Sequence, residues 1–417
     1  MQITIRRGRD LKLPGEPAQE VKLTRAVRTA ALVGSDLPDV RPDFAVEVGD
    51  RVSAGQTLFI DRRRPELTFC APISGRVSQL RRGPRRALDL IAIEREDAEA
   101  QVREFRIPPT SDKEGVRRLL LEAGQWPAFR TRPFERIPEP NAQPAAIFVT
   151  AIDTEPLCAN PNGVLRQEIE PFRAGLEALR QLTDGLVFVC LAFDAPPIGD
   201  IERVQAVEFA GSHPAGLPGT HIHHLMPVGR KRSVWHIGYQ DVIAIGRLFG
   251  TGRIWSERIV SVAGSAVRDP CLVRTTLGAD LNDLVAGNSH AADMELVSGS
   301  LLSGRPARFL GRYHLQVAAM ALGRRSNGQG ILTRIADAFG KQETAAIIPV
   351  ADHDSVMALD IAAVPLLRAL SVGDAETAER LGCLELAESD VALLTHVCPS
   401  GVDYAPLLRG VLEEIEQ

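Results

Sequence analysis

A stretch near the end of the chain has the spacing of an iron–sulfur binding sequence without its ligands. It reads Glu388-Ser-Asp-Val-Ala-Leu-Leu-Thr-His-Val-Cys-Pro399. Bacterial 4Fe–4S sequences place cysteines as C-x2-C-x2-C-x3-C-P, so Cys398 takes the last position, and Leu394, Val391 and Glu388 take the other three. A cluster needs four soft anionic ligands, and one thiolate beside two aliphatic side chains and a carboxylate cannot hold it. The segment therefore keeps the frame of an electron-transfer module without its chemistry.

A second candidate for a functional site is a loop rich in glycine and histidine. It reads Phe209-Ala-Gly-Ser-His-Pro-Ala-Gly-Leu-Pro-Gly-Thr-His-Ile-His-His224. Glycines expose backbone amides, which can cradle an anion or a flat ligand. We therefore expect a ligand or partner loop, whose candidate residues are Gly211, His213, Gly216, Gly219 and His221. His221 and His223 would share one face of a strand, but no nearby carboxylate or thiolate completes a metal site, and no metal is expected. The alternative is a structural turn with hydrogen-bonded histidines.

Composition limits the class of protein. The 417 residues suffice for three or four domains. The 48 basic and 53 acidic residues give a net charge of -5, which argues against a nucleic-acid partner. The six cysteines never form a C-x-x-C pair, which fits a reducing cytosol. No apolar run approaches the roughly 18 residues of a membrane span, and the first residues alternate like an edge strand, so we expect any membrane role to be peripheral or through a partner.

Between residues 30 and 94 the chain shows short strands separated by glycine turns. The pattern V-x-V-G-D-x-V-x-x-G-Q-x-L, followed by A-P-x-S-G-x-V, resembles the biotinyl and lipoyl carrier domains. Gly49 and Gly55 would supply positive-φ turns, and Gly75 a second tight turn. A swinging-arm carrier needs a lysine at the hairpin between the two motifs, where this chain has Arg62, Arg63 and Arg64. A guanidinium cannot be acylated in its place, so we predict the fold without the carrier function.

The next region, to about Trp255, alternates helices with apolar strands, which predicts an α/β layer. A capping box at 111–114 opens a helix, and the runs 146–151 and 186–191 predict central parallel strands. No G-x-G-x-x-G follows a strand. Gly250-Thr-Gly252-Arg-Ile-Trp255 comes nearest, but it ends in a bulky tryptophan, so dinucleotide binding by this route is unsupported.

The next part of the chain predicts a strand–turn–strand unit over 258–278 and a short helix at 281–284, as in a β-grasp module. The remaining residues predict helices, and Asp403 is expected to cap the last of them. The predicted fold is multidomain α/β, and each unit is expected to bury its own core. The predicted domains are a barrel-sandwich domain with an N-terminal strand at 1–100, a degenerate Rossmann-like domain at 101–256, a β-grasp (SLBB-like) domain at 257–322 and a helical domain at 323–417.

The order of these parts and several local sequences resemble one family, the A subunit of the Na+-translocating NADH:quinone oxidoreductase (NqrA). More distantly they resemble the C subunit of the Rnf complex and the flavin-binding subunit of respiratory complex I. The resemblance runs nearly end to end, although the stretch 322–348 is short against the family. The sequences that carry it are Gly8-Arg-Asp-Leu-Lys-Leu-Pro-Gly-Glu-Pro17, His213-Pro-Ala-Gly-Leu-Pro-Gly-Thr-His221, Tyr239-Gln-Asp-Val-Ile-Ala-Ile-Gly-Arg-Leu-Phe249, Leu310-Gly-Arg-Tyr-His314 and Leu381-Gly-Cys-Leu-Glu-Leu386.

The resemblance implies a subunit of a sodium-translocating NADH:ubiquinone reductase that binds no cofactor of its own and contributes no catalytic residue that we identify. In the Rnf and complex I relatives, the region matching Asp153-Thr-Glu-Pro156 and the glycine loop help to hold flavin and NADH. Here flavins and iron–sulfur clusters are expected in partner subunits, and ubiquinone is the implied substrate. The implied partners are the integral membrane subunits, the B subunit in particular, at the cytoplasmic face of the bacterial inner membrane. The alternative is a soluble scaffold or an NADH–flavin electron-input subunit of an Rnf-like complex.

Seven arginines lie in two neighbouring hairpins of the predicted barrel, although the protein as a whole is negatively charged. They would create a local positive field, and we expect them to help dock the chain on its membrane partner or on anionic headgroups. The alternative is a solvated charged hairpin. The seven are Arg62, Arg63, Arg64, Arg81, Arg82, Arg85 and Arg86.

Overall fold

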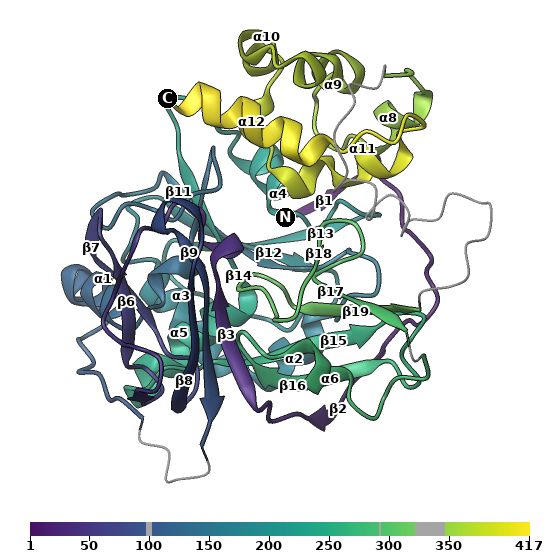
Figure 1. Cartoon of the computed structure of the whole chain (residues 1–417). Coiled ribbons are helices and arrows are strands. Elements are labelled where there is room, and N and C mark those ends of the chain that lie inside the picture. Colours follow the sequence, from purple (N-terminus) through teal and green to yellow (C-terminus); the bar gives the residue numbers. More distant parts are fainter. Residues whose placement is uncertain (97–101, 292, 322–346) are drawn as a thin grey trace.

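The computed structural model describes residues 1–96, 102–291, 293–321 and 347–417. A small two-sheet barrel, an α/β layer and a mixed sheet lie side by side, and the helices at the end of the chain lie across one side of them (Figure 1). This is the multidomain α/β architecture that the sequence predicts. Of the stretch 322–348, which is short against the family, residues 322–346 lie outside the described residues.

The barrel consists of a four-stranded and a three-stranded antiparallel sheet. Its strands are β3 (Thr29–Val33), β9 (Leu88–Arg95), β8 (Gly75–Arg82) and β5 (Arg51–Val52) in the first sheet, and β4 (Pro42–Phe44), β6 (Thr57–Asp61) and β7 (Arg64–Cys70) in the second. Gly49 and Gly55 have positive φ, as predicted. Gly75 does not form the predicted tight turn. It begins β8, where a Cβ atom would lie 2.1 Å from the carbonyl oxygen of Glu94, so glycine there lets two strands approach.

The α/β layer has six strands in the order β1-β13-β12-β11-β14-β10. Its strands are β1 (Gln2–Thr4), β10 (Arg130–Arg132), β11 (Ala146–Ala151), β12 (Leu186–Ala192), β13 (Val204–Ala210) and β14 (Val234–Gly238). The predicted strands β11 and β12 are central and parallel. Ile147 and Val149 face the helices α3 (Ile169–Leu179) and α5 (Tyr239–Thr251), whereas Phe148 faces the opposite side. The predicted helix is α1 (Lys113–Glu122), but its cap is Asp112, which accepts a hydrogen bond from the Gly115 amide at 3.0 Å.

The third unit is a mixed sheet in the order β18-β17-β19-β15-β16-β2. Its elements are β15 (Glu257–Ala263), β16 (Cys271–Thr276), α6 (Leu281–Val285), β17 (Met294–Ser298), β18 (Arg305–Pro306) and β19 (Gln316–Ala321). The strand–turn–strand–helix order is the one predicted. The sheet also receives β2 (Ala18–Thr24), which pairs in parallel with β16 although it comes from the beginning of the chain.

The helical segment contains α8 (Ala351–Val356), α9 (Ala363–Val372), α10 (Ala375–Arg380), α11 (Ala392–Val397) and α12 (Tyr404–Glu416). Asp403 caps α12 as predicted, because its carboxylate accepts from the Ala405 amide at 3.1 Å. Leu408, Val411 and Leu412 of α12 are buried in the core of this segment.

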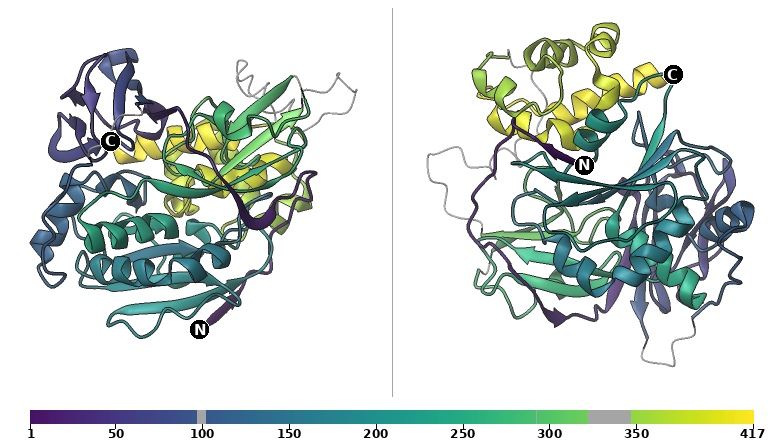
Figure 2. Two further views of the ribbon diagram at one scale, coloured as in Figure 1. Left: turned by 90° about the horizontal axis from the view of Figure 1, so that it is seen from below. Right: turned by 180° about the vertical axis from the view of Figure 1, so that it is seen from behind.

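The N-terminal segment runs along the side of the molecule and links three units (Figure 2). β1 pairs with β13 at the edge of the α/β sheet. The Gly8 amide then donates to the Ser355 carbonyl of α8 at 2.9 Å, and the Gly264 amide donates to the Gly15 carbonyl at 3.2 Å before the chain enters β2. The first 24 residues therefore do not belong to the barrel.

The barrel and the α/β layer share one apolar core. Leu58 and Leu67 of the barrel belong to the same buried cluster as Leu119 of α1, Trp126 and Ile147 of β11. The expectation that each unit buries its own core is therefore wrong for these two, because α1 and Trp126 pack between them. The predicted domain boundaries stay predictions.

Candidate functional site

The α/β sheet has a topological switch point between β11 and β14. From β11 the chain passes to β12 and β13 on one side, and β14 is then added on the other side of β11. Open α/β sheets bind ligands outside the carboxyl ends of their strands at such a point. A cavity of about 630 Å³ lies there, lined by Thr150 and Asp153 from the end of β11 and by Gly238 and Tyr239 from the end of β14.

Three other units close this cavity, and one of them is the barrel, which contributes Ser35, Asp36 and Pro38. The segment after β18 contributes Arg312, Tyr313 and His314, and the helical segment contributes Glu388 and Arg409. Burial lowers the pKa of His314 to about 4, so that its ring is neutral at physiological pH. The site is an interdomain cavity whose lining mixes charged side chains with polar and apolar ones.

Two carboxyl groups follow β11, where a dinucleotide-binding domain would place its phosphate loop. Asp153 accepts from the Glu155 amide at 2.9 Å, and Glu155 accepts from the hydroxyl of Ser300 at 2.6 Å. Burial, and next the charge of Glu155, raise the pKa of Asp153 to about 7. The following helix, α2 (Pro161–Gln167), is capped by the side chain of Asn160. The place where a phosphate would lie is thus acidic and does not fit one.

The opposite wall carries arginines. Asp241 of α5 accepts from Arg258 of β15 and, at 2.9 Å, from Arg312. Asp36 accepts from the guanidinium of Arg305 and, at 2.9 Å, from the backbone amide of Arg312. Three guanidiniums therefore share two carboxylates, and these contacts tie the third sheet to both the α/β layer and the barrel.

A buried ion pair attaches the helical segment beside the cavity. Arg132 and Asp390 have side chains only 1% exposed, and Arg132 Nη1 donates to Asp390 Oδ2 at 2.9 Å. Arg132 also donates to Glu135, which accepts from His236 Nε2 at 2.8 Å. A Cβ atom on Gly219 would lie 2.3 Å from Asp390 Oδ1, so this carboxylate sits against the first turn of α4 (Pro218–Leu225), where an anion is favoured.

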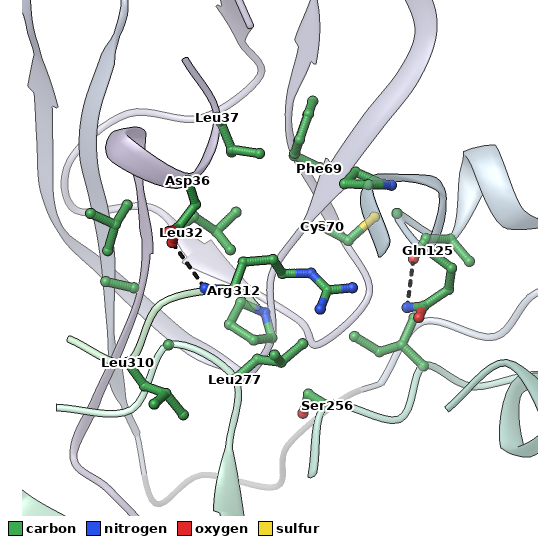
Figure 3. A pocket seen from close by; sticks show the side chains of 18 of the residues that line it. Leu32, Asp36, Leu37, Phe69, Cys70, Gln125, Ser256, Leu277, Leu310 and Arg312 are labelled. Carbon is green, nitrogen blue, oxygen red and sulfur yellow. Dashed lines mark hydrogen bonds between the residues drawn. The ribbon is translucent and has the colours of Figure 1, made fainter. Parts of the chain in front are cut away.

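A second, smaller pocket lies where the barrel, the α/β layer and the third sheet meet (Figure 3). Its walls are largely apolar, and the guanidinium of Arg312 extends into it (Figure 3). Leu32, Leu37, Phe69 and Leu277 are among the lining residues. The pocket holds only about 50 Å³, about a third of the roughly 150 Å³ cavity that admits benzene in other proteins. It does not accommodate an aromatic ring in this conformation.

The glycine and histidine loop contacts the chain itself. The predicted strand for His221 and His223 is wrong, because both lie on α4, which Pro218 begins. His221 Nε2 lies 2.9 Å from the Ala215 carbonyl, and burial lowers its pKa to about 3. The amide of His213 donates to Asp10 at 2.9 Å.

The candidate glycines of this loop permit close packing. A Cβ atom would lie 2.4 Å from the Ile5 carbonyl oxygen at Gly211 and 2.7 Å from the Thr154 nitrogen at Gly216. Gly219 packs in the same way against Asp390, so each of the three glycines lets a different segment of the chain approach the loop closely. These contacts favour the structural alternative, and a ligand role for the loop stays a prediction.

The two cofactor-like sequences serve the fold. Gly252 has a φ of +69° and ends α5 as its left-handed cap, so Gly250–Trp255 is a helix end. In the C-terminal run, Val391, Leu394 and Cys398 are buried, and Cys398 Sγ lies 3.2 Å from the hydroxyl of Tyr404. Glu388 forms hydrogen bonds of 2.6 and 2.7 Å with Arg409. These residues do not fit an iron–sulfur cluster.

In the part of the chain that the structure describes, no group of three or more His, Cys, Asp or Glu side chains is placed to hold a metal ion. Among the same residues, no helix has the length and apolarity needed to cross a membrane.

The arginine hairpins lie together on the barrel. Arg82 lies 4.8 Å from the ring centre of Phe44, and Arg62 lies 4.0 Å from Asp43. Asp43 and Phe44 are neighbours on β4, so both hairpins lie beside this strand. Arg64 points inward, with its side chain 11% exposed and its Nε 2.7 Å from Asp61. The other six are exposed, and we call them the barrel arginine surface: Arg62, Arg63, Arg81, Arg82, Arg85 and Arg86.

Sequence reasoning missed the charged residues that line or support the large cavity. Asp241 and Arg258 stand within apolar runs, and a charge in such a run signals a buried pair. The sequence does not reveal the partner, since Arg312 is 71 residues from Asp241 and Asp390 is 258 residues from Arg132.

The fold and the site define a class of protein: a multidomain α/β chain with a barrel-sandwich unit and a switch-point cavity that lacks a phosphate-binding loop. Residues 3–96 match the NqrA N-terminal barrel-sandwich hybrid domain, 111–254 the NqrA second alpha/beta domain, and 259–308 the NQRA C-terminal domain. The chain belongs to the NqrA family, the A subunits of the Na+-translocating NADH-quinone reductases, and so is one component of a multi-subunit reductase.

Curated relatives match the whole chain. The A subunit of the Na(+)-translocating NADH-quinone reductase from Pseudomonas aeruginosa (strain UCBPP-PA14) is 44% identical over 445 residues, covering 100% of this chain and 99% of the relative. That of Serratia proteamaculans (strain 568) is 42% identical over 447 residues with the same coverage. A chain of the NAD+-reducing nickel–iron hydrogenase in the air-oxidized state aligns with a TM-score of 0.44 and 14% identity over 75% of this chain and 63% of that chain, which is too low to support an argument.

Proposed function

We propose that this chain is a cofactor-free peripheral subunit of its reductase, and that it docks on the integral membrane subunits, the B subunit above all, at the cytoplasmic face of the bacterial inner membrane. The observation that carries the cofactor-free part is the pair Asp153 and Glu155 at the end of β11. Their carboxyl groups occupy the place of a phosphate loop and would repel a nucleotide or flavin phosphate. Flavins and iron–sulfur clusters would then belong to partner subunits.

The C-terminal segment supports the same proposal. Val391, Leu394 and Cys398 pack into the core of the helical segment, so the frame of a cluster-binding module serves as a packing element. An NADH–flavin input subunit of an Rnf-like complex would need both sites, and this chain has residues that fit neither.

Ubiquinone binding is the secondary part of the proposal and rests on the family resemblance. The large cavity carries charged side chains on several of its walls, and the apolar pocket beside Arg312 holds about 50 Å³. A quinone ring would need that pocket to widen. Docking and structural support are therefore the primary proposed role.

Two measurements test the proposal. The purified full-length chain should be colourless, with no flavin or iron–sulfur absorption in the visible range. When tagged and recovered from gently solubilised membranes, it should bring down the integral subunits, the B subunit among them. Stoichiometric flavin or iron in the purified chain would contradict the cofactor-free part. Recovery of the chain alone, under conditions that keep the other subunits together, would contradict docking.

A further inference from the structure

The barrel arginine surface has more positive charge than nearby carboxylates balance. Arg81 pairs with Asp89 at 3.0 Å, and Arg62 lies 4.0 Å from Asp43. For the remaining four, the described part of the chain offers no carboxylate within ion-pair distance; these are Arg63, Arg82, Arg85 and Arg86. Four unbalanced guanidiniums on one end of the barrel create a positive field on a protein whose net charge is -5.

The turn between β8 and β9 favours a role for these side chains. Arg85 and Arg86 both have left-handed backbone, with φ of +52° and +60°. This conformation is uncommon in residues other than glycine and asparagine, and it has an energetic cost. Glycine would form the turn with less strain, so two exposed arginines at these positions indicate a use for their guanidiniums.

The surface lacks the apolar anchor of a stable protein–protein interface. Such interfaces are usually centred on buried aromatic or aliphatic side chains. None of the large apolar side chains that are exposed in the described chain lies in these hairpins. Val48 is exposed on the barrel, but it lies in the turn beside Val77, which is five residues before the hairpin end of β8. Phe44 is half-buried beneath Arg82. A cationic surface without an apolar centre suits a diffuse anionic partner.

We propose that the barrel arginine surface binds the headgroups of anionic phospholipids and so orients the chain against the membrane beside its complex. The inference rests on the proposed peripheral location. Guanidiniums bind phosphate oxygens with paired hydrogen bonds. Each cation close to an anionic leaflet strengthens binding by about fivefold, and salt screens the attraction.

Vesicle co-sedimentation of the full-length chain tests this proposal. The chain should bind vesicles containing phosphatidylglycerol, bind phosphatidylcholine vesicles at least tenfold more weakly, and dissociate as salt is raised. The variant R63S/R82S/R85S/R86S should lose at least tenfold in affinity for the anionic vesicles. A control variant with the same net charge, R118S/R166S/R232S/R368S, removes exposed arginines outside the barrel and should bind like the parent. Unchanged melting temperatures establish that both variants are folded.

The outcomes separate this inference from the proposed function. Equal binding of the parent to both kinds of vesicle, or equal losses in the two variants, would overturn lipid binding. If the hairpin variant binds vesicles like the parent but no longer joins the solubilised complex, the surface contacts another protein of the complex, and the lipid proposal is wrong. If the parent binds anionic vesicles but never recovers partner subunits, the proposed docking fails while lipid binding stands.

Discussion

At the scale of single residues, the proposal that the switch-point cavity holds no phosphate-bearing cofactor depends on Asp153 and Glu155. The strand before them is a buried parallel strand of the kind that precedes a phosphate-binding loop. The residues after it are acidic, and a nearby helix start is already capped by Asn160. The backbone at this position therefore resembles that of a nucleotide-binding fold, and the acidic side chains support the proposal that no nucleotide binds here.

Asp153 also makes stability depend on pH. Its pKa rises from an ordinary 3.8 to about 7 in the folded chain, so the folded form holds a proton that the unfolded form has released between these values. Stability should therefore fall as the pH rises from about 4 to about 7. Asp153→Asn should remove this loss and raise the free energy of unfolding at pH 8 by about 2 kcal/mol, with little gain at pH 4.

Urea unfolding at the two pH values measures the effect. The control is Asp184→Asn, since an exposed hydrogen bond from Lys113 lowers the pKa of Asp184. Its carboxylate favours the folded state, so the control should not gain stability at pH 8. Equal stability of Asp153→Asn and the parent at both pH values would contradict the raised pKa of this carboxyl group.

At the scale of elements, sequence patterns predicted those strands and helix ends that depend on residues close together in the sequence. The strands at 146–151 and 186–192 follow from continuous apolar runs, and the cap of the last helix follows from Asp403. The α4 helix was missed because alternating histidines suggested a strand, whereas Pro218 and contacts with Asp390 from a distant segment favour a helix. The cavity was missed because its walls come from four units that meet only in the folded chain.

The attachment of the helical segment depends on one buried pair. In Asp390→Ala the buried guanidinium of Arg132 loses one of its two carboxylate partners and keeps only Glu135. The substitution also removes the acceptor for the Ala387 amide. Breaking such a pair typically costs about 3–5 kcal/mol, so we expect a large fall in the urea midpoint and faster protease cleavage around residues 347–417. Arg230→Ala, which breaks the exposed pair with Glu379, is the matched control and should change either readout little. A midpoint for Asp390→Ala equal to that of the control would show that packing alone holds this segment.

At the scale of the whole molecule, the units are interlocked although each has its own strand pattern. The chain starts in the α/β sheet, passes the helical segment, enters the third sheet as β2 and only then forms the barrel. Sequence patterns do not reveal this path, because pairing between β2 and β16 joins residues about 250 positions apart. The family resemblance correctly predicted the order of the units and left these cross-connections unseen.

Truncation before Arg258 tests this interlocking. If each unit buried its own core, as the sequence predicts, residues 1–257 would fold alone, but the structure predicts the opposite. The fragment would lose β16, which is the partner strand of β2, and both arginines that pair with Asp241. An unpaired strand and a buried carboxylate without its counter-charges should leave it aggregated or largely unfolded. Co-expression with residues 258–417 should restore a soluble complex, because the missing strand and both guanidiniums return. A well-dispersed NMR spectrum from the isolated fragment would instead establish that the barrel and the α/β layer, with their shared core, fold without the third sheet.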